Sequence, residues 1–189
     1  MITINSFDMD SRIAVKALEF LRESILKILL VTDGRTTDML EALLNEKMIV
    51  HVIRQEQMNE ESSGDPFYIR ESLLVSEKSG FLVSHNFSLV LSKHVPPSLF
   101  EEISNRQEGI GKSIGTMGLR TFRKVLDFGA KNEEEAVDLF QKPIELRFPE
   151  LRGQVPYKKY SIYFGPEPGI QMLEYFNPNV IGYGAKNRQ

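Results

Sequence analysis

A carboxylate interrupts an apolar pattern near the C-terminal end of the sequence. The stretch GIQMLEYF, residues 169–176, reads as a strand with one apolar side formed by Ile170, Met172 and Phe176. Glu174 falls on that same side. A buried carboxylate must pair with a cation or keep its proton, and a protonated carboxyl group near pH 7 can serve as a general acid or bind a hydroxyl. Glu174 is therefore a candidate catalytic residue, and the alternative is a solvated glutamate on an edge strand.

Two arginines share strand sides with apolar residues. Arg70 lies on the same side of FYIRESLLV as Tyr68 and Leu74. Arg54 continues the side of Met48 and its apolar successors in the preceding strand. Either guanidinium could bind a carboxylate with two hydrogen bonds. The alternatives are a solvent-facing arginine at residue 70 and a strand-end arginine that reaches water at residue 54.

Two motifs resemble nucleotide sites and fail on their spacing. GIGKS, residues 109–113, lacks the glycine that a P-loop requires five residues before the glycine of GKS, where Arg106 stands. The turn can still present backbone N–H groups to an anion. DFG at residues 127–129 occurs without the other kinase motifs, in a chain too short for a kinase.

The histidines and the absence of cysteine narrow the chemistry. His51, His85 and His94 are far apart and show no metal-ligand spacing. His85 lies on the apolar side of its strand, so we predict a hydrogen-bonded core histidine rather than a ligand or base. The sequence contains no cysteine, which excludes disulfides and thiolate catalysis. We expect neither a metal nor an organic cofactor.

Composition favours a single cytoplasmic domain. The 189 residues carry a net charge of −3, which argues against nucleic acid or an anionic membrane as the main partner. The N-terminus lacks an apolar signal core, and the longest apolar run is far shorter than the ~20 residues that span a bilayer. The composition indicates no particular oligomeric state.

Periodicity predicts an α+β fold with an antiparallel sheet of about six strands and helices packed on it. The expected elements are helical spacing over 11–31 as one helix or two, a helix starting at Thr36 or Thr37, a strand from Met48, a hairpin of 67–75 and 81–91, a helix from VPPSLFEEI, a strand over 121–128, a short helix over 132–140 and a hairpin of 157–164 and 169–176. We expect one domain over 1–189, with a core over about 11–178 and a flexible tail over 179–189.

The order of several short motifs resembles a known family. VTDGRTTDMLE, IVHVIRQE, YIRESLLV, GIGKSIG, TFR and KYSIYFGPEPGIQMLEYF follow one another between about residues 28 and 178. This order resembles chorismate–pyruvate lyase, in particular its divergent archaeal, cyanobacterial and actinobacterial branch. The resemblance implies an antiparallel sheet that closes over an internal ligand cavity. It also implies conversion of chorismate to 4-hydroxybenzoate and pyruvate without metal or cofactor.

The resemblance assigns residues to roles. The family's arginine motif matches YIRE, which gives Arg70, and its glutamate motif matches MLEYF, which gives Glu174. Backbone N–H groups that hold a carboxylate map to Arg35 in DGRT and to Ile110 in the turn that begins with Gly109. Gly109 replaces the family's usual proline, and Arg35 replaces an apolar residue. These changes affect substrate fit more than anion binding, because the contacts are made by the backbone.

Arg54 and Lys158 are the candidates for binding the second carboxylate of chorismate.

A different class of protein shares the fold that the resemblance implies, namely the effector-binding (UTRA-like) domains of GntR-type regulators, which bind small molecules and catalyse nothing. A sensor or carrier of an aromatic acid is therefore the alternative function. A third possibility is a domain with no small-molecule role. The pair Arg70 and Glu174 favours the lyase.

Overall fold

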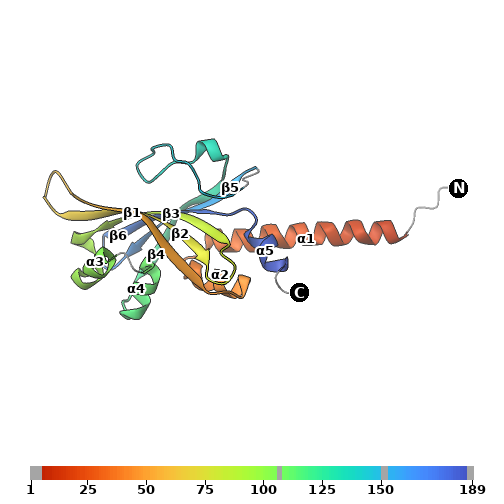
Figure 1. The fold of residues 1–189 in the computed structure, drawn as a ribbon, viewed down its shortest axis with the longest axis horizontal. Coiled ribbons are helices and arrows are strands. Elements are labelled where there is room, and N and C mark those ends of the chain that lie inside the picture. The colour runs from red at the N-terminus through yellow and green to blue at the C-terminus, as the bar shows by residue number, and fades with distance from the viewer. Residues whose placement is uncertain (1–5, 106–107, 150–152, 187–189) are drawn as a thin grey trace.

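The computed structural model describes residues 6–105, 108–149 and 153–186, and these residues form one six-stranded antiparallel sheet (Figure 1). The strand order is β1-β2-β3-β6-β5-β4. The strands are β1 (Met48–Asn59), β2 (Pro66–Ser76), β3 (Leu82–Leu91), β4 (Phe122–Lys131), β5 (Val155–Tyr163) and β6 (Pro168–Phe176). The predicted α+β class and antiparallel sheet are confirmed.

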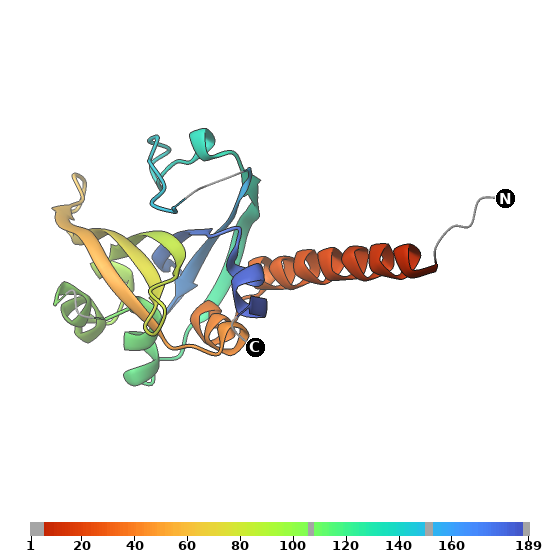
Figure 2. The same cartoon turned by 45° about the vertical axis from the view of Figure 1, so that its right-hand side comes forward.

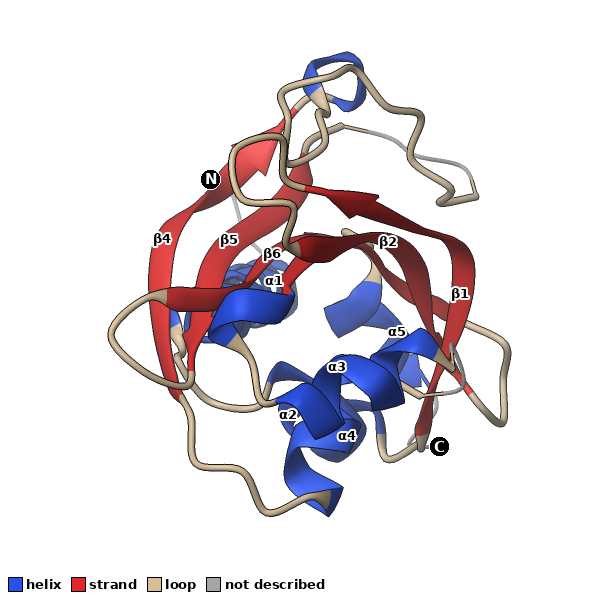
Figure 3. Ribbon diagram, turned by 90° about the vertical axis from the view of Figure 1, so that its left-hand side faces the viewer, coloured by secondary structure: helices blue, strands red, loops and turns tan. Residues whose placement is uncertain are grey.

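The helices lie mainly on one side of a strongly curved sheet. They are α1 (Ser6–Val31), α2 (Thr36–Leu44), α3 (Pro97–Ser104), α4 (Ile110–Thr116) and α5 (Val180–Lys186), with single 3-10 turns η1 (Ser92–His94) and η2 (Glu133–Glu135). Figure 3 shows the sheet bending around α2, α3 and α4. Gly169 permits the close approach of η1 that leads into α3, because a Cβ at Gly169 would lie 2.5 Å from the carbonyl oxygen of His94.

The curved sheet has a buried core on each face. On the concave face, α3 and α4 cover one end of the sheet, and α1, α2 and α5 cover the other. Strand β2 shows the alternation clearly, since every second residue from Tyr68 to Ser76 is buried. On the convex face, the segment 132–149 packs over Phe87, Leu173 and Tyr175. Both faces of the central strands are therefore covered.

The segment 132–140 does not form the predicted helix. Only Glu133–Glu135 make a single 3-10 turn, and Ala136 then adopts an extended backbone with φ −67° and ψ 131°. The hydroxyl of Tyr175 donates to the carbonyl of Val137 and accepts from its N–H, at 2.8 and 3.0 Å. These bonds occupy both backbone groups that a helix would require. The prediction was wrong because a distant strand competes for this backbone.

A β-bulge overturns the prediction for Arg54. Val52 lies opposite Ser72, whereas Arg54 lies opposite Glu71, so Ile53 is an extra residue in β1. Side chains after the bulge point to the other face of the sheet. Arg54 is exposed there and donates two hydrogen bonds to Glu56, at 2.7 and 2.8 Å.

The two ends of the described chain behave differently from each other. Helix α1 is one continuous helix that projects from the domain (Figures 1 and 2), and its side chains from Ile13 to Glu23 are exposed. Within the tail that was predicted to be flexible, 179–189, residues 180–186 form the helix α5. Val180 is fully buried against α1 and α2 and fixes this helix in place. Residues 187–189 lie outside the described part of the chain.

Candidate functional site

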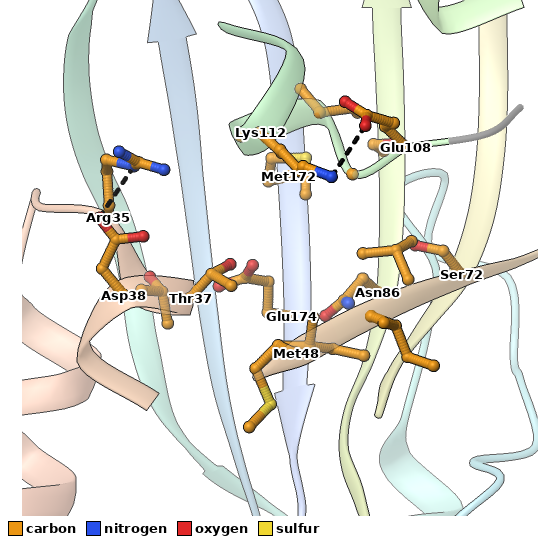
Figure 4. Close-up of a pocket in the computed structure, with 18 of the residues that line it drawn as sticks. Arg35, Thr37, Asp38, Met48, Ser72, Asn86, Glu108, Lys112, Met172 and Glu174 are labelled. Carbon is orange, nitrogen blue, oxygen red and sulfur yellow. Dashed lines mark ion pairs between the residues drawn. The ribbon is translucent and has the colours of Figure 1, made fainter. Parts of the chain in front are cut away.

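A cavity of about 720 Å³ lies between the concave face of the sheet and the starts of α2 and α4. Polar side chains from three central strands line its floor: Ser72 on β2, Asn86 and Ser88 on β3, and Glu174 on β6. Buried polar groups are ordinarily hydrogen-bonded. Here the Oδ1 of Asn86 and the Oε2 of Glu174 are buried and have no hydrogen-bond partner within the described residues. Figure 4 shows these two side chains together on the cavity floor. The arrangement is typical of a site that takes a polar ligand.

Glu174 is buried and lies beside a tyrosine. Glu174 is only 9% exposed. The hydroxyl of Tyr160 on β5 donates a hydrogen bond to its Oε1 at 3.2 Å. Burial raises the pKa of Glu174, while the charges of Lys158 and Arg123 and the hydrogen bond from Tyr160 oppose that rise. Burial and the charge of Glu174 also raise the pKa of Tyr160 well above its usual value. A carboxyl group in this setting can hold or deliver a proton near neutral pH.

Lys158 lies beside Glu174 on the neighbouring strand but is not among the residues that line the cavity. It lies opposite Glu174 in the β5–β6 register. Its buried Nζ donates to the carbonyls of Leu29 and Thr32, at 3.4 and 2.5 Å, and to Thr36 Oγ1 at 3.4 Å. The ammonium therefore sits at the C-terminal end of α1, where the helix dipole favours a cation. Burial lowers the pKa of Lys158, and the nearby charge of Glu174 opposes this. These acceptors occupy the ammonium, and Lys158 is not among the residues that line the cavity, so its contact with a substrate stays a prediction.

Arg70 lies on the cavity wall close to the start of α4. It is 2% exposed, and its Nη2 donates to the carbonyl of Glu108. In the sheet, Glu174 lies opposite Asn86, which lies opposite Ser72, two residues from Arg70. The backbones of Arg70 and Glu174 are therefore roughly 12 Å apart, from strand spacing and rise. Two side chains that reach inward over this separation can hold opposite ends of a six-membered ring.

The two predicted backbone positions both lie at helix starts on the cavity. Arg35 precedes the first residue of α2, and Ile110 is the first residue of α4. N–H groups in a first helical turn have no partner inside their helix. The side chain of Arg35 pairs with Asp38 at 3.2 Å, and Lys112 pairs with Glu108 at 2.8 Å, as the dashed lines in Figure 4 show. These ion pairs lie around the cavity, where a ligand would enter.

Among the six predicted site residues, the structure brings Arg35, Arg70, Ile110 and Glu174 to one cavity. Lys158 lies beside Glu174 on the neighbouring strand, and Arg54 lies on the other face of the sheet. Sequence reasoning did not assign a role to Arg123 or to Tyr160, both of which line the cavity. The only available signal for Arg123 was its place in the TFR motif. Tyr160 could have been found from its strand side, which it shares with residue 158.

The described residues contain no cluster of histidine, aspartate and glutamate side chains placed to hold a metal ion. In the same part of the chain, every helix is too short or too polar to pass through a bilayer.

Comparison with known proteins found one distantly related sequence and several solved structures with a similar fold. No family model matches the chain. It is 24% identical over 167 residues to "Chorismate pyruvate-lyase" of Mycobacterium leprae (strain TN), and the match covers 82% of this chain and 75% of the relative.

Among solved structures, PhnF from Mycobacterium smegmatis superposes with a TM-score of 0.50 at 14% identity, over 78% of this chain. The chain spans 65% of that PhnF chain. The separate effector domain of PhnF gives a TM-score of 0.49 at 13% identity, over 78% of this chain and 90% of the domain. The protein therefore has the chorismate lyase-like fold, which the effector-binding domains of GntR regulators share.

Proposed function

We propose that this protein is a chorismate–pyruvate lyase that converts chorismate to 4-hydroxybenzoate and pyruvate. The observation that carries the proposal is the meeting of Arg70 and Glu174 in one cavity, with the Oε2 of Glu174 lacking a partner among the described residues. The 24% identity to a chorismate pyruvate-lyase supports the same reaction.

Arg70 and the helix starts bind the ring carboxylate of the substrate. A guanidinium can form two parallel hydrogen bonds to a carboxylate. The backbone N–H groups of Arg35 and Ile110 add positive partial charge on the same anion. Because Arg70 is almost completely buried, its interaction with the anion is screened less by water than a surface ion pair.

Glu174 acts at the opposite end of the ring. It binds the ring hydroxyl, and burial raises its pKa, which favours the protonated form of the carboxyl group. In the reaction, the bond between the ring carbon and the ether oxygen breaks, and the carbon that bears the hydroxyl loses a proton. The departing enolpyruvate takes up a proton and becomes pyruvate, so atoms and charge balance. Glu174 is the group placed to donate or relay that proton.

Aromatisation of the ring supplies much of the driving force. The contribution of the protein is then mainly positioning and electrostatic stabilisation in the cavity. The product keeps the ring carboxylate and the hydroxyl, so it retains the contacts to Arg70 and Glu174. We therefore expect tight product binding, with product release limiting turnover.

The alternative function is a sensor or carrier of an aromatic acid. The fold is compatible with it, since PhnF has the same fold at a TM-score of 0.50. A binding protein needs Arg70 to hold an anion. It has less need of a buried carboxyl group with a raised pKa at the far end of the cavity.

Turnover of purified protein with chorismate, without added metal, separates the two functions. We expect 4-hydroxybenzoate and pyruvate in equal amounts from the wild type, and large losses of rate in Glu174→Gln and Arg70→Lys. Arg54→Gln is the matched control, because it removes an exposed arginine on the other face of the sheet. No turnover with saturable binding of 4-hydroxybenzoate would favour the sensor. Neither turnover nor binding would overturn both functions.

A further inference from the structure

Besides Arg35 and Arg70, a third arginine lines the cavity, namely Arg123, which belongs to the other half of the sheet from Arg70. Strands β2 and β4 each lie two strands away from β6, which carries Glu174, but in opposite directions. Arg123 lies on β4 opposite Ile162 and lines the cavity together with Arg70. The two arginines therefore approach Glu174 from the two halves of the sheet.

Both guanidinium groups reach the start of α4. The Nη2 of Arg70 donates to the carbonyl of Glu108. The Nη2 of Arg123 lies 3.9 Å from the position that a Cβ on Gly111 would occupy. Glu108 and Gly111 are about one helical turn apart. The curvature of the sheet, visible in Figure 3, thus brings two positive charges from distant strands to one cavity wall.

Arg123 differs in its contacts from Arg35, Arg54 and Arg147. Its Nη1 donates to the carbonyl of Gly34 at 2.9 Å, and its buried Nε has no hydrogen-bond partner among the described residues. Arg35, Arg54 and Arg147 each lie within ion-pair distance of a carboxylate. In the described part of the chain, Arg123 has no such carboxylate. Its Nε and Nη2 form the edge that binds a carboxylate with two hydrogen bonds.

We propose that Arg123 binds the second carboxylate of the substrate, the one on the enolpyruvyl side chain, while Arg70 binds the ring carboxylate. This inference rests on the proposed function. It gives Arg123 the role that the sequence suggested for Arg54 and Lys158. The product 4-hydroxybenzoate has only one carboxylate and leaves Arg123 unbound. Arg123 is therefore a specificity-determining residue that distinguishes the two-carboxylate substrate from the one-carboxylate product.

Steady-state kinetics and product binding of Arg123→Gln test this role. Loss of a charge-assisted hydrogen-bonded pair predicts a KM for chorismate that rises about 10- to 100-fold. The Kd of 4-hydroxybenzoate should change by less than about threefold, because the product does not reach Arg123. Lys124→Gln is the matched control, since it removes the next positive charge on β4 from an exposed side chain on the other face. An unchanged KM, or an equal weakening of substrate and product, would overturn the proposal.

A binding experiment makes this test independent of catalysis. Calorimetry compares 3-(carboxymethoxy)benzoate, which has two carboxylates, with 3-methoxybenzoate, which has one. We expect the wild type to prefer the diacid and Arg123→Gln to lose that preference, with Arg123→Lys retaining part of it. If the preference and its loss occur without turnover of chorismate, only the lyase function fails. No preference in the wild type, or a preference that survives Arg123→Gln, would overturn the role of Arg123.

Discussion

Each face of the sheet carries a polar cluster centred on a glutamate, which is Glu71 on β2 for the convex face and Glu174 on β6 for the cavity face. On the convex face, Glu71 lies 2.9 Å from the Nε2 of His85 and 3.8 Å from the Nε of Arg147. On the cavity face, Glu174 has Tyr160 on one oxygen and no described partner on the other. The convex cluster provides its carboxylate with both a hydrogen bond and a cation from the protein.

The difference shows how similar chemistry serves structure on one face and a ligand on the other. The segment 132–149 packs over Phe87 and Tyr175, and His85 is fully buried, so no ligand can reach this imidazole without displacing packed residues. The side chain of Glu71 is 21% exposed. The cavity face instead remains open beside Glu174 and Arg70. A buried polar atom without a protein partner is costly, and a ligand that satisfies it recovers that cost. The prediction of His85 as a hydrogen-bonded core histidine is confirmed by its contact with Glu71.

The largest expected effect is a difference in catalytic activity between variants of Glu174 and variants of Glu71. Glu174→Gln removes the ionisable group from the cavity, and we expect kcat to fall by roughly 10²- to 10⁴-fold, the usual contribution of a general acid or base. Glu71→Gln, on the other face, should keep kcat within about threefold. It should instead lose about 1–3 kcal/mol of unfolding free energy, because His85 loses its charged partner. Chorismate turnover and urea unfolding measure these effects. A large loss of kcat in Glu71→Gln would remove the distinction between the faces.

The next effect concerns the ammonium of Lys158. Lys158→Met leaves the carbonyls of Leu29 and Thr32 without their donor and Glu174 without its nearest positive charge. We expect a loss of about 3 kcal/mol in unfolding free energy, as when one partner of a buried pair is removed. The double variant with Glu174→Gln should recover part of this loss, because an amide needs no counter-charge. If the free-energy changes of the two single variants simply add in the double variant, Lys158 acts on α1 alone.

The third expectation is that Glu174 and His85 change the folding stability in opposite directions as the pH rises. The pKa of Glu174 is raised in the folded protein, so its stability contribution is present below about pH 4.5 and is lost as pH rises through the folded pKa. The pKa of His85 is lowered, mainly by burial, so its contribution is present above about pH 6.5 and is lost as pH falls through the folded pKa.

Thermal unfolding between pH 4 and 9 checks both signs. Glu174→Gln should raise Tm relative to the wild type at neutral and alkaline pH. His85→Gln should flatten the fall in Tm on the acidic side. If both variants show the same dependence of Tm on pH as the wild type, Glu174 and His85 do not determine how stability changes with pH.

The smallest effect concerns two tyrosines on β5. The hydrogen bond from Tyr160 lowers the pKa of Glu174, so Tyr160→Phe should raise that pKa and move the activity profile to higher pH by about one unit or less. Tyr157→Phe is the control: Tyr157 lies away from the cavity beside Asp127, and burial with this carboxylate raises its pKa to about 12. The pH dependence of kcat measures the shift. A shift to lower pH in Tyr160→Phe would contradict the assigned direction.

The short-range periodicity of the sequence determined which face of the sheet many side chains occupy and which neighbouring strands pair. A period of two placed Glu174 on the apolar side of β6 and Arg70 on the side of Tyr68, and both lie on the cavity. Hairpin signals correctly predicted the pairs β2–β3 and β5–β6 and hence the antiparallel sheet. These features follow from the sequence because alternation within one strand fixes which face a side chain takes.

Only the tertiary structure decided the rest, because it depends on contacts between residues far apart in the chain. The bulge at Ile53 moved Arg54 to the other face, since β1 must keep its pairing with β2. The ammonium of Lys158 donates to a carbonyl at the end of α1, over 120 residues away in the sequence. The hydroxyl of Tyr175 donates to the backbone carbonyl of Val137. The curvature of the sheet brought Arg123 to the cavity that Arg70 also lines. The sequence determined which face each strand presents, and the long-range pairing determined which charges meet across it.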